Sequence, residues 1–195
     1  YQTGQWNPAD ENAFAPALCN RIDRNTAGIV IAAKNAAALR AMNEKIRLRQ
    51  VRKYYLCVVH GQLAPPSGVL TGYLLKEGDS VCVFDRPYPG ALTARTRYQT
   101  LQVHGALSLM ECELLTGRTH QIRAQMAHAG HPLLGDGKYG FEKQNKKYGV
   151  FKQALLSYRV TFDFKSPAPP LDYLSGKSFS LDTDAFTAAF YAATP

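Results

Sequence analysis

The stretch from residue 54 to residue 115 constrains the fold more than any other part of the chain. It contains five segments that are rich in β-branched and aromatic residues, at 54–60, 69–75, 81–84, 94–103 and 106–115. Turn-forming residues separate four of them, as Glu77-Gly78-Asp79, Pro87-Tyr88-Pro89-Gly90 and His104-Gly105. Short connections of this kind join neighbouring antiparallel strands. The sequence therefore predicts an antiparallel sheet.

Other segments predict helices and two more strands around this sheet. We expect a buried strand at 28–34, a helix at 36–49 with Asn35 as its cap, a short helix at 120–128 capped by Thr119 and ended at Gly130, a strand at 154–164 and a helix at 183–192. In the first helix, Leu39, Met42 and Ile46 form the apolar face. The other face carries Arg40, Lys45, Arg47 and Arg49, and we favour a solvated face over contact with phosphates. The predicted class is α+β, with a mainly antiparallel mixed sheet flanked by helices.

One predicted strand carries a stripe of polar side chains. By the two-residue period of a strand, Arg95, Arg97 and Gln99 share one face, opposite Ala94, Thr96 and Tyr98. The stripe could be a basic surface that binds a ligand, or simply a solvated face of the sheet.

Composition narrows the class of protein. The 195 residues are 46% hydrophobic and 19% charged, which is typical of a soluble globular protein and is consistent with a single domain over 1–195. The net charge of +8 favours a polyanionic partner such as RNA, although charge alone leaves that partner open. The four cysteines lack the spacing of a disulfide framework or a zinc site, and no apolar stretch has the length of a membrane span or the form of a secretory signal. We expect a cytoplasmic protein with no membrane partner.

Asp23 lies between Arg21 and Arg24, just before the apolar run at 29–33. Positive charge on both sides favours the ionised carboxylate, which suits a nucleophile better than a general acid. The alternative interpretation is that Asp23 caps a turn through Asn25, Thr26 and Gly28.

A second polar cluster runs from 116 to 123 and is followed by the loop at 130–136. Two such clusters far apart in one small chain suggest a single site. The histidines of this region, His120, His128 and His131, could suggest a metal site. However, His120 and His128 would lie roughly 12 Å apart along a helix, which is too far to share an ion, so structural roles are favoured and no metal is expected.

Four motifs, taken in order, resemble those of the RluA-type family of RNA pseudouridine synthases. They are NRIDRNTAG at 20–28, KYYLCVVHG at 53–61, GRTHQIR at 117–123 and GHPLLGD at 130–136. The match is specific because none of the pieces is a common short motif. Two positions depart from the family pattern: Asn20 stands where the family usually has His, and Ala27 where it usually has Ser.

The resemblance implies roles for individual residues. It makes Asp23 the nucleophile, Arg123 its ion-pair partner, and Tyr55 the ring that lies against the target base, with Arg21 entering the space that the extruded uridine leaves. The further candidates for RNA contact are Arg24, Lys53, Arg118, His120 and Gln121. Without the resemblance, Tyr55 would be interpreted as a core aromatic, and Arg24, Lys53 and Arg118 could equally be solvated.

The resemblance also implies a fold and an activity. It predicts the pseudouridine synthase fold with a central RNA-binding cleft and isomerisation of uridine in structured RNA, with 23S ribosomal RNA favoured over transfer RNA. No cofactor is expected, the molecule is expected to be a monomer, and the chain is expected to be the C-terminal piece of a longer protein. Two alternatives differ in class: a non-catalytic RNA-binding module with the same fold, and a hydrolase that uses Asp23 with His120 or His131. The hydrolase lacks a nucleophile elbow and a paired-carboxylate arrangement.

Overall fold

The computed structural model describes residues 14–193, which form two compact units. Within the described residues, the small unit comprises 14–22, 30–51 and 161–178, and the sheet unit comprises 23–29, 52–160 and 179–193. The prediction of one domain over 1–195 stays a prediction, and residues 1–13, 194 and 195 of that range lie outside the described part.

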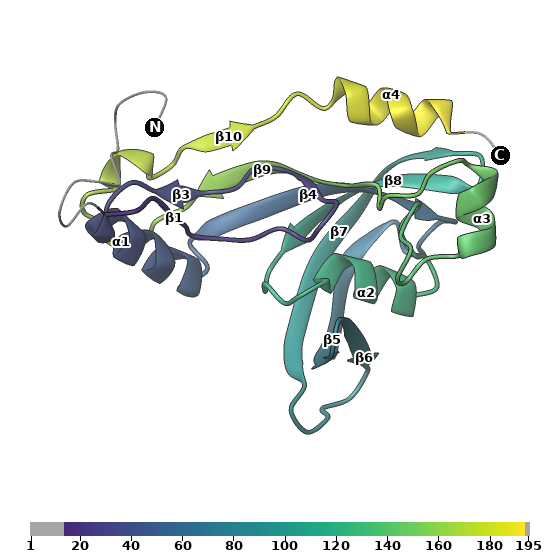
Figure 1. Cartoon of the computed structure of the whole chain (residues 1–195), viewed down its shortest axis with the longest axis horizontal. Helices are drawn as coiled ribbons and strands as arrows, with labels where there is room; N and C mark the ends of the chain where they lie inside the picture. Colours follow the sequence, from purple (N-terminus) through teal and green to yellow (C-terminus); the bar gives the residue numbers. More distant parts are fainter. Residues whose placement is uncertain (1–13, 194–195) are drawn as a thin grey trace. The chain divides into compact units, whose positions relative to one another are not determined.

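A mainly antiparallel sheet makes up most of the sheet unit (Figure 1). Among the described residues it has eight strands, seven in the order β10-β9-β4-β8-β7-β5-β6 and β2 paired in parallel with β9. The bounds are β2 Ala27–Gly28, β4 Val51–His60, β5 Ser67–Glu77, β6 Ser80–Phe84, β7 Leu92–His104, β8 Leu107–Leu114, β9 Leu155–Phe162 and β10 Ser178–Ser180. The pairs β4–β8, β8–β7, β7–β5 and β5–β6 are all antiparallel. The predicted sheet, including all five strands expected between 54 and 115, is confirmed.

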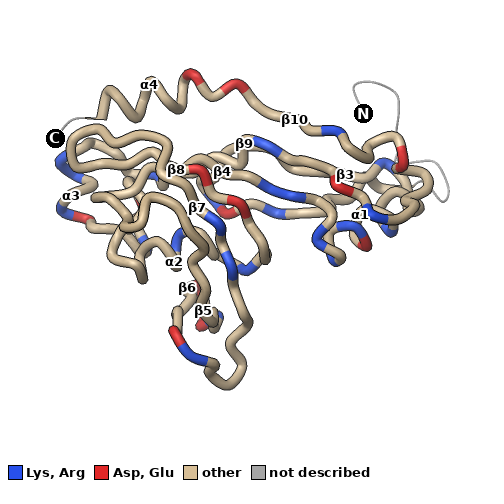
Figure 2. The backbone as a smooth tube through the Cα atoms, turned by 180° about the vertical axis from the view of Figure 1, so that it is seen from behind, with Lys and Arg blue, Asp and Glu red and all other residues tan. Residues whose placement is uncertain are grey.

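The two faces of this sheet have different chemistry. On the front face, helix α2 (Gln121–His128) packs Ile122 and Met126 against a buried cluster that includes Tyr55 of β4. On the rear face, Arg97 and Gln99 of β7 are exposed, as the strand period predicts. Seen from behind in Figure 2, basic residues occur along β4, β7 and β9. Any chemistry built on α2 therefore lies on the opposite face from the basic stripe of β7.

Helix α2 begins differently from the prediction. Its N-terminal flanking residue is His120, with φ 52° and no side-chain capping hydrogen bond, so the expected cap by Thr119 is wrong. The chain enters the helix through a left-handed residue, which the pattern of capping residues does not reveal. The C-terminal end is as predicted, because Gly130 has φ 86° just beyond the helix.

Two more helices belong to the sheet unit. Helix α4 (Asp184–Ala192) confirms the helix expected at 183–192, and its Phe190 packs with Val58 and Leu109. Helix α3 (Glu142–Lys147) was not predicted, because EKQNKK has no apolar periodicity.

The small unit contains helix α1 (Ala36–Arg47), the short strands β1 (Ala17–Leu18) and β3 (Ala32–Ala33), which pair with each other, and the 3-10 turn η1 (Asp172–Leu174). The predicted cap is confirmed, since Asn35 Oδ1 accepts a hydrogen bond of 2.8 Å from the backbone N–H of Ala38. The prediction that Lys45 is solvated is wrong: the residue is 3% exposed, and its Nζ donates to the backbone oxygen of Ser166 at 2.6 Å. A segment distant in sequence supplies that acceptor, so helix periodicity alone could not reveal it.

The buried strand expected at 28–34 is also wrong. Only its ends are strands, because Gly28 pairs with β9 and Ala32–Ala33 pairs with β1, while Val30 between them is 38% exposed. The two ends have different partners, so the segment cannot form one continuous strand. Among the described residues, no helix has the length and apolar character needed to cross a membrane.

Candidate active site

Asp23 lies in a tight turn that is anchored to β9. The backbone N–H of Thr26 donates to the backbone oxygen of Asp23 at 3.0 Å, and Asn25 has φ 66°. A Cβ on Gly28 would lie 2.2 Å from the backbone oxygen of Ser157, and its φ is 124°, so only glycine lets the chain approach β9 this closely. The side chain of Asp23 is 17% exposed, which keeps the carboxylate accessible at a fixed position.

The carboxylate of Asp23 faces Arg123 of α2. Arg123 Nη1 lies 3.4 Å from Asp23 Oδ2. The same guanidinium binds Asp136 through two shorter bonds, Nε to Oδ2 at 2.7 Å and Nη2 to Oδ1 at 3.0 Å. Arg123 is thus shared by two carboxylates, which we call the Arg123 cluster (Asp23, Arg123 and Asp136).

Burial and charge act in opposite directions in this cluster. Burial alone would lower the pKa of Arg123, but the bonds to Asp136 and the charge of Asp23 outweigh it and raise that pKa. Burial would raise the pKa of Asp136, but the hydrogen bonds from Arg123 and from the backbone N–H groups of Lys138 and Tyr139 lower it overall. Arg123 and Asp136 are therefore both ionised near neutral pH.

Tyr55 lies on the same face of the sheet, inside the core behind α2, and is 5% exposed. Burial raises the pKa of its hydroxyl, a hydrogen bond with Ser157 lowers it, and the negative charge of Asp23 raises it further. Tyr54, its neighbour, lines a hollow on the rear face. The expectation that the two tyrosines point to opposite faces is confirmed.

His120 and Tyr139 form a second contact next to Arg123. His120 Nδ1 lies 2.8 Å from the hydroxyl of Tyr139, and that hydroxyl accepts a hydrogen bond from the backbone N–H of Val81 at 2.9 Å. The guanidinium of Arg123 lies 5.2 Å from the centre of the Tyr139 ring. Burial lowers the pKa of His120 against the opposing effect of Asp23, which favours the neutral imidazole at neutral pH.

Gln121 is placed inside the protein. Its Oε1 accepts from Thr116 Oγ1 and from the N–H of Arg118, and its Nε2 donates to the backbone oxygen of Arg95 and to Thr96 Oγ1. These four bonds use the whole hydrogen-bonding capacity of the amide. The geometry therefore favours a role in holding the 116–121 loop, and contact of Gln121 with RNA stays an untested prediction.

The basic residues singled out from the sequence are spread over the molecule. Arg118 Nε donates to the backbone oxygen of Thr93 at 3.0 Å, and Lys53 Nζ lies 3.7 Å from where a Cβ on Gly117 would be. Arg24 is exposed and follows Asp23 directly, whereas Arg21 is exposed in the small unit. The structure thus places Asp23 and Arg123 in contact and Lys53 beside the 116–121 loop.

Sequence reasoning missed two parts of this site. The 130–136 loop was noted beside the second polar cluster, but neither Asp136 nor Tyr139 was singled out as a site residue, although Asp136 is fully buried and binds Arg123. The signal was an acidic residue between Gly135 and Gly137, but a Gly-Asp-Gly segment is read first as a solvated turn. Likewise, His128 and His131 have partners in the protein, namely Asp85 Oδ1 at 2.8 Å and the backbone oxygen of His60 at 2.9 Å.

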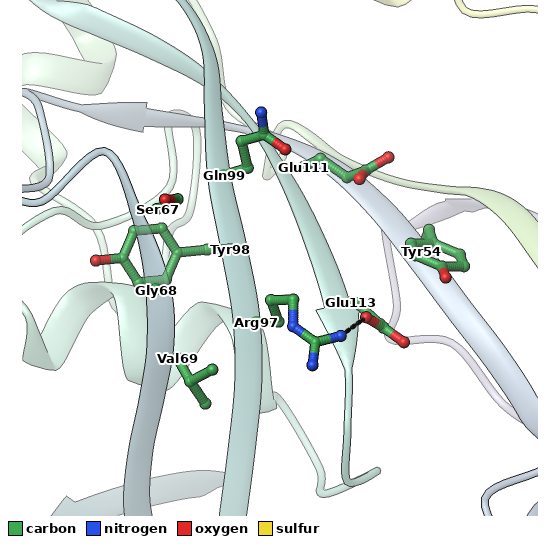
Figure 3. A pocket seen from close by; sticks show the side chains of 9 residues that line it. All are labelled: Tyr54, Ser67, Gly68, Val69, Arg97, Tyr98, Gln99, Glu111 and Glu113. Atoms are coloured by element: carbon green, nitrogen blue, oxygen red, sulfur yellow. Dashed lines mark hydrogen bonds and ion pairs between the residues drawn. The ribbon is translucent and has the colours of Figure 1, made fainter.

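The rear face of the sheet carries a hollow of about 310 Å³ between β4, β5, β7 and β8 (Figure 3). Glu113 at its edge binds Arg52 Nε at 2.7 Å and also pairs with Arg97, an arrangement that we call the Glu113 cluster (Glu113, Arg52 and Arg97). Arg52 and Arg97 are 41% and 53% exposed. The hydrogen bonds from these arginines outweigh the effect of burial and lower the pKa of Glu113.

The fold and this site define the class of protein. The family model described as "RNA pseudouridylate synthase" matches residues 2–128, and the chain belongs to this family. Two solved human structures share the fold. For "RNA Pseudouridylate Synthase Domain Containing 4" the TM-score is 0.74 at 21% identity, and the match covers 93% of this chain and 77% of that one. For "RNA Pseudouridylate Synthase Domain Containing 1" the TM-score is 0.66 at 22% identity, and the match covers 93% of this chain and 82% of that one. The predicted family and fold are confirmed.

Among named relatives, the chain is similar to the "Ribosomal large subunit pseudouridine synthase C" of two bacteria. It is 31% identical to the Vibrio vulnificus protein over 158 residues, which cover 80% of this chain and 50% of the relative. It is 35% identical to the Haemophilus influenzae protein over 154 residues, which cover 75% and 47%. The chain thus spans about half the length of these relatives.

Proposed function

We propose that this chain is the catalytic part of an RNA pseudouridine synthase that isomerises uridine in large-subunit ribosomal RNA. The observation that carries the proposal is the Asp23 carboxylate, accessible at 17% exposure and faced by the buried Arg123. Two similar proteins are named as synthases acting on the large ribosomal subunit, which supports ribosomal over transfer RNA as the substrate. We further propose that the protein is cytoplasmic and binds RNA as a monomer; the net charge of +8 supports binding to a polyanion such as RNA.

The isomerisation of uridine gives a role to each of the proposed catalytic residues. The bond between C1′ of the ribose and N1 of uracil breaks, the base turns, and a bond from C1′ to C5 forms, while C5 loses a proton and N1 gains one. Asp23 acts as the nucleophile, Arg123 orients it, and the Tyr55 hydroxyl takes part in proton movement beside the base. Because no group enters or leaves and no electrons are exchanged, the reaction needs no cofactor.

The remaining basic residues are proposed as contacts with the RNA. Arg24, Lys53 and Arg118 would bind phosphates, His120 would donate a hydrogen bond to the bound nucleotide, and Arg21 would occupy the space that the extruded uridine leaves. Gln121 would act through the loop that it holds. We further propose that residues 1–195 fold as one catalytic domain within a longer protein, which is consistent with the half-length match to the relatives.

The alternative is an RNA-binding module that retains the fold without activity. The Arg123 cluster disfavours it, because the three charges sum to −1 beside the proposed RNA site. A protein that only binds a polyanion gains nothing from such a charge.

Tritium release from 23S ribosomal RNA transcribed with 5-tritiated uridine tests the proposal. We expect the chain to release tritium and Asp23→Asn to release none, while both proteins bind the RNA. Tritium release from transfer RNA alone would make transfer RNA the substrate instead of ribosomal RNA. Binding without tritium release from either RNA would favour the non-catalytic module.

A further inference from the structure

The Asp136 carboxylate is the most constrained charged group of the Arg123 cluster. It is fully buried, and Oδ1 accepts bonds from the N–H groups of Lys138 at 2.8 Å and Tyr139 at 3.1 Å. Both oxygens also bind Arg123, at 2.7 and 3.0 Å. A buried carboxylate with four charge-assisted or backbone hydrogen bonds has little freedom to move.

The backbone around Asp136 is fixed as tightly as its side chain. A Cβ on Gly135 would lie 2.2 Å from the backbone oxygen of Lys152, and Gly135 has φ 75°. A Cβ on Gly140 would lie 2.2 Å from the backbone oxygen of Asp136 itself. These two glycines let the 135–140 segment fold onto its neighbours, and the position of the Asp136 carboxylate follows from that packing.

Arg123 binds Asp136 and Asp23 in different ways. Asp136 takes Nε and Nη2 in a two-point contact, which fixes the plane of the guanidinium. Nη1 is left for Asp23 at 3.4 Å, a longer and weaker contact. The positive charge of Arg123 is therefore balanced chiefly by Asp136, and its contact with Asp23 is the weaker of the two.

We propose that Asp136 is a positioning residue for the reaction: it fixes Arg123 and balances its charge, so that Nη1 orients the Asp23 carboxylate without neutralising it. The proposal rests on the proposed function of Asp23 as the nucleophile. Without the Asp136 carboxylate, the Arg123 guanidinium would turn toward Asp23, the carboxylate that remains in the cluster, and form a closer ion pair with it. A nucleophile in a close ion pair is less reactive, because its charge is stabilised before the reaction.

The first test needs no RNA. In the parent protein labelled with 15N-arginine, NMR should show slow rotation of the Arg123 Nη groups and protection of its Hε, unlike the exposed Arg86. In Asp136→Asn, the amide presents a donor to either Arg123 or the backbone N–H groups, so the two-point contact through Nε and Nη2 is lost and the protection of the Arg123 Hε should fall. Equal mobility of Arg123 and Arg86 in the parent would overturn the proposal, even if the variant fails to fold.

The second test measures chemistry. With 5-tritiated 23S RNA, Asp136→Asn should lower the single-turnover rate by about 10- to 100-fold, by analogy with the loss seen when a partner that orients a metal ligand is removed. RNA affinity should change by less than about twofold, because Asp136 is fully buried and acts through Arg123. The matched control Glu113→Gln, the same chemical change in the Glu113 cluster, should alter neither the rate nor the RNA affinity.

The outcomes separate the two proposals. An unchanged single-turnover rate in a folded Asp136→Asn protein would contradict the positioning role. A parent chain that releases no tritium would contradict the proposed function, and the NMR measurement would still decide whether Asp136 fixes Arg123.

Discussion

The Arg123 cluster and the Glu113 cluster are built on the same scheme with the charges reversed. In the first, one arginine is shared by two carboxylates, and in the second, one carboxylate is shared by two arginines. The Arg123 side chain is 7% exposed and Asp136 is fully buried, whereas Arg52 and Arg97 are 41% and 53% exposed. The sums of charge are −1 and +1. Removing one member of the buried Arg123 cluster leaves a buried charge without its partner, which is costly. In the Glu113 cluster, water can solvate the charges that remain.

The largest difference expected between the Arg123 cluster and the Glu113 cluster is in their effect on catalytic activity. Asp23→Asn should lower tritium release by more than about 1000-fold, because the amide keeps the shape of the side chain and removes the attacking charge. Glu113→Gln should retain the parent rate. A folded Asp23→Asn protein with activity within tenfold of the parent would end the assignment of Asp23 as nucleophile.

The next difference concerns stability. Arg123→Ala should lower the free energy of unfolding by about 3–5 kcal/mol, since it leaves the buried Asp136 carboxylate without its ionic partner. Arg97→Ala should cost at most about 1 kcal/mol, because its charge is exposed and Arg52 still binds Glu113. Urea unfolding of both variants measures this, and equal losses would mean that the two clusters do not differ in the way burial suggests.

Two adjacent tyrosines allow a finer comparison of the faces. Tyr55→Phe should lower the single-turnover rate by about 10- to 100-fold with little change in RNA affinity, because the ring remains and the hydroxyl is lost. Tyr54→Phe, one residue away on the rear face, should leave both quantities unchanged. If Tyr55→Phe weakened binding and rate equally, Tyr55 would have a binding role only.

The smallest effect is expected on the pH dependence of stability. The pKa of Glu113 is lowered below its ordinary 4.5 in the folded protein, so its contribution is present above pH 4.5 and is lost as pH falls through the folded value. The exposure of its partners limits that contribution to about 1 kcal/mol. Unfolding free energies measured from pH 6 down to about pH 3 should therefore fall less steeply in Glu113→Gln than in the parent. Identical slopes would show that the ion pairs of Glu113 contribute nothing.

Local patterns predicted much of the fold. Alternating apolar residues and turn formers identified the five strands between 54 and 115, and Asn35 marked the start of α1. The errors fell where a distant segment decided the outcome. Lys45 is buried because Ser166 accepts its hydrogen bonds, and the 28–34 run is divided because its ends pair with different strands.

The candidate site shows the same division. The motifs identified Asp23 and Arg123, which lie 100 positions apart, and the structure brings them within 3.4 Å. They did not identify Asp136 as the partner that takes most of the Arg123 charge. Nor did they show that Gln121 is fully bonded inside the protein.

By itself, the sequence determined the five strands between 54 and 115, the family resemblance and the residue types of the site, because strand period, turn chemistry and motif spacing act over a few neighbouring residues. Only the tertiary structure decided how the charges are shared. Whether Arg123 neutralises Asp23 depends on distances of 3.4 Å to one carboxylate and 2.7 Å to another, and on the burial of all three groups. Coulombic interaction depends on separation and local dielectric in space, and neither can be read from the order of residues along the chain.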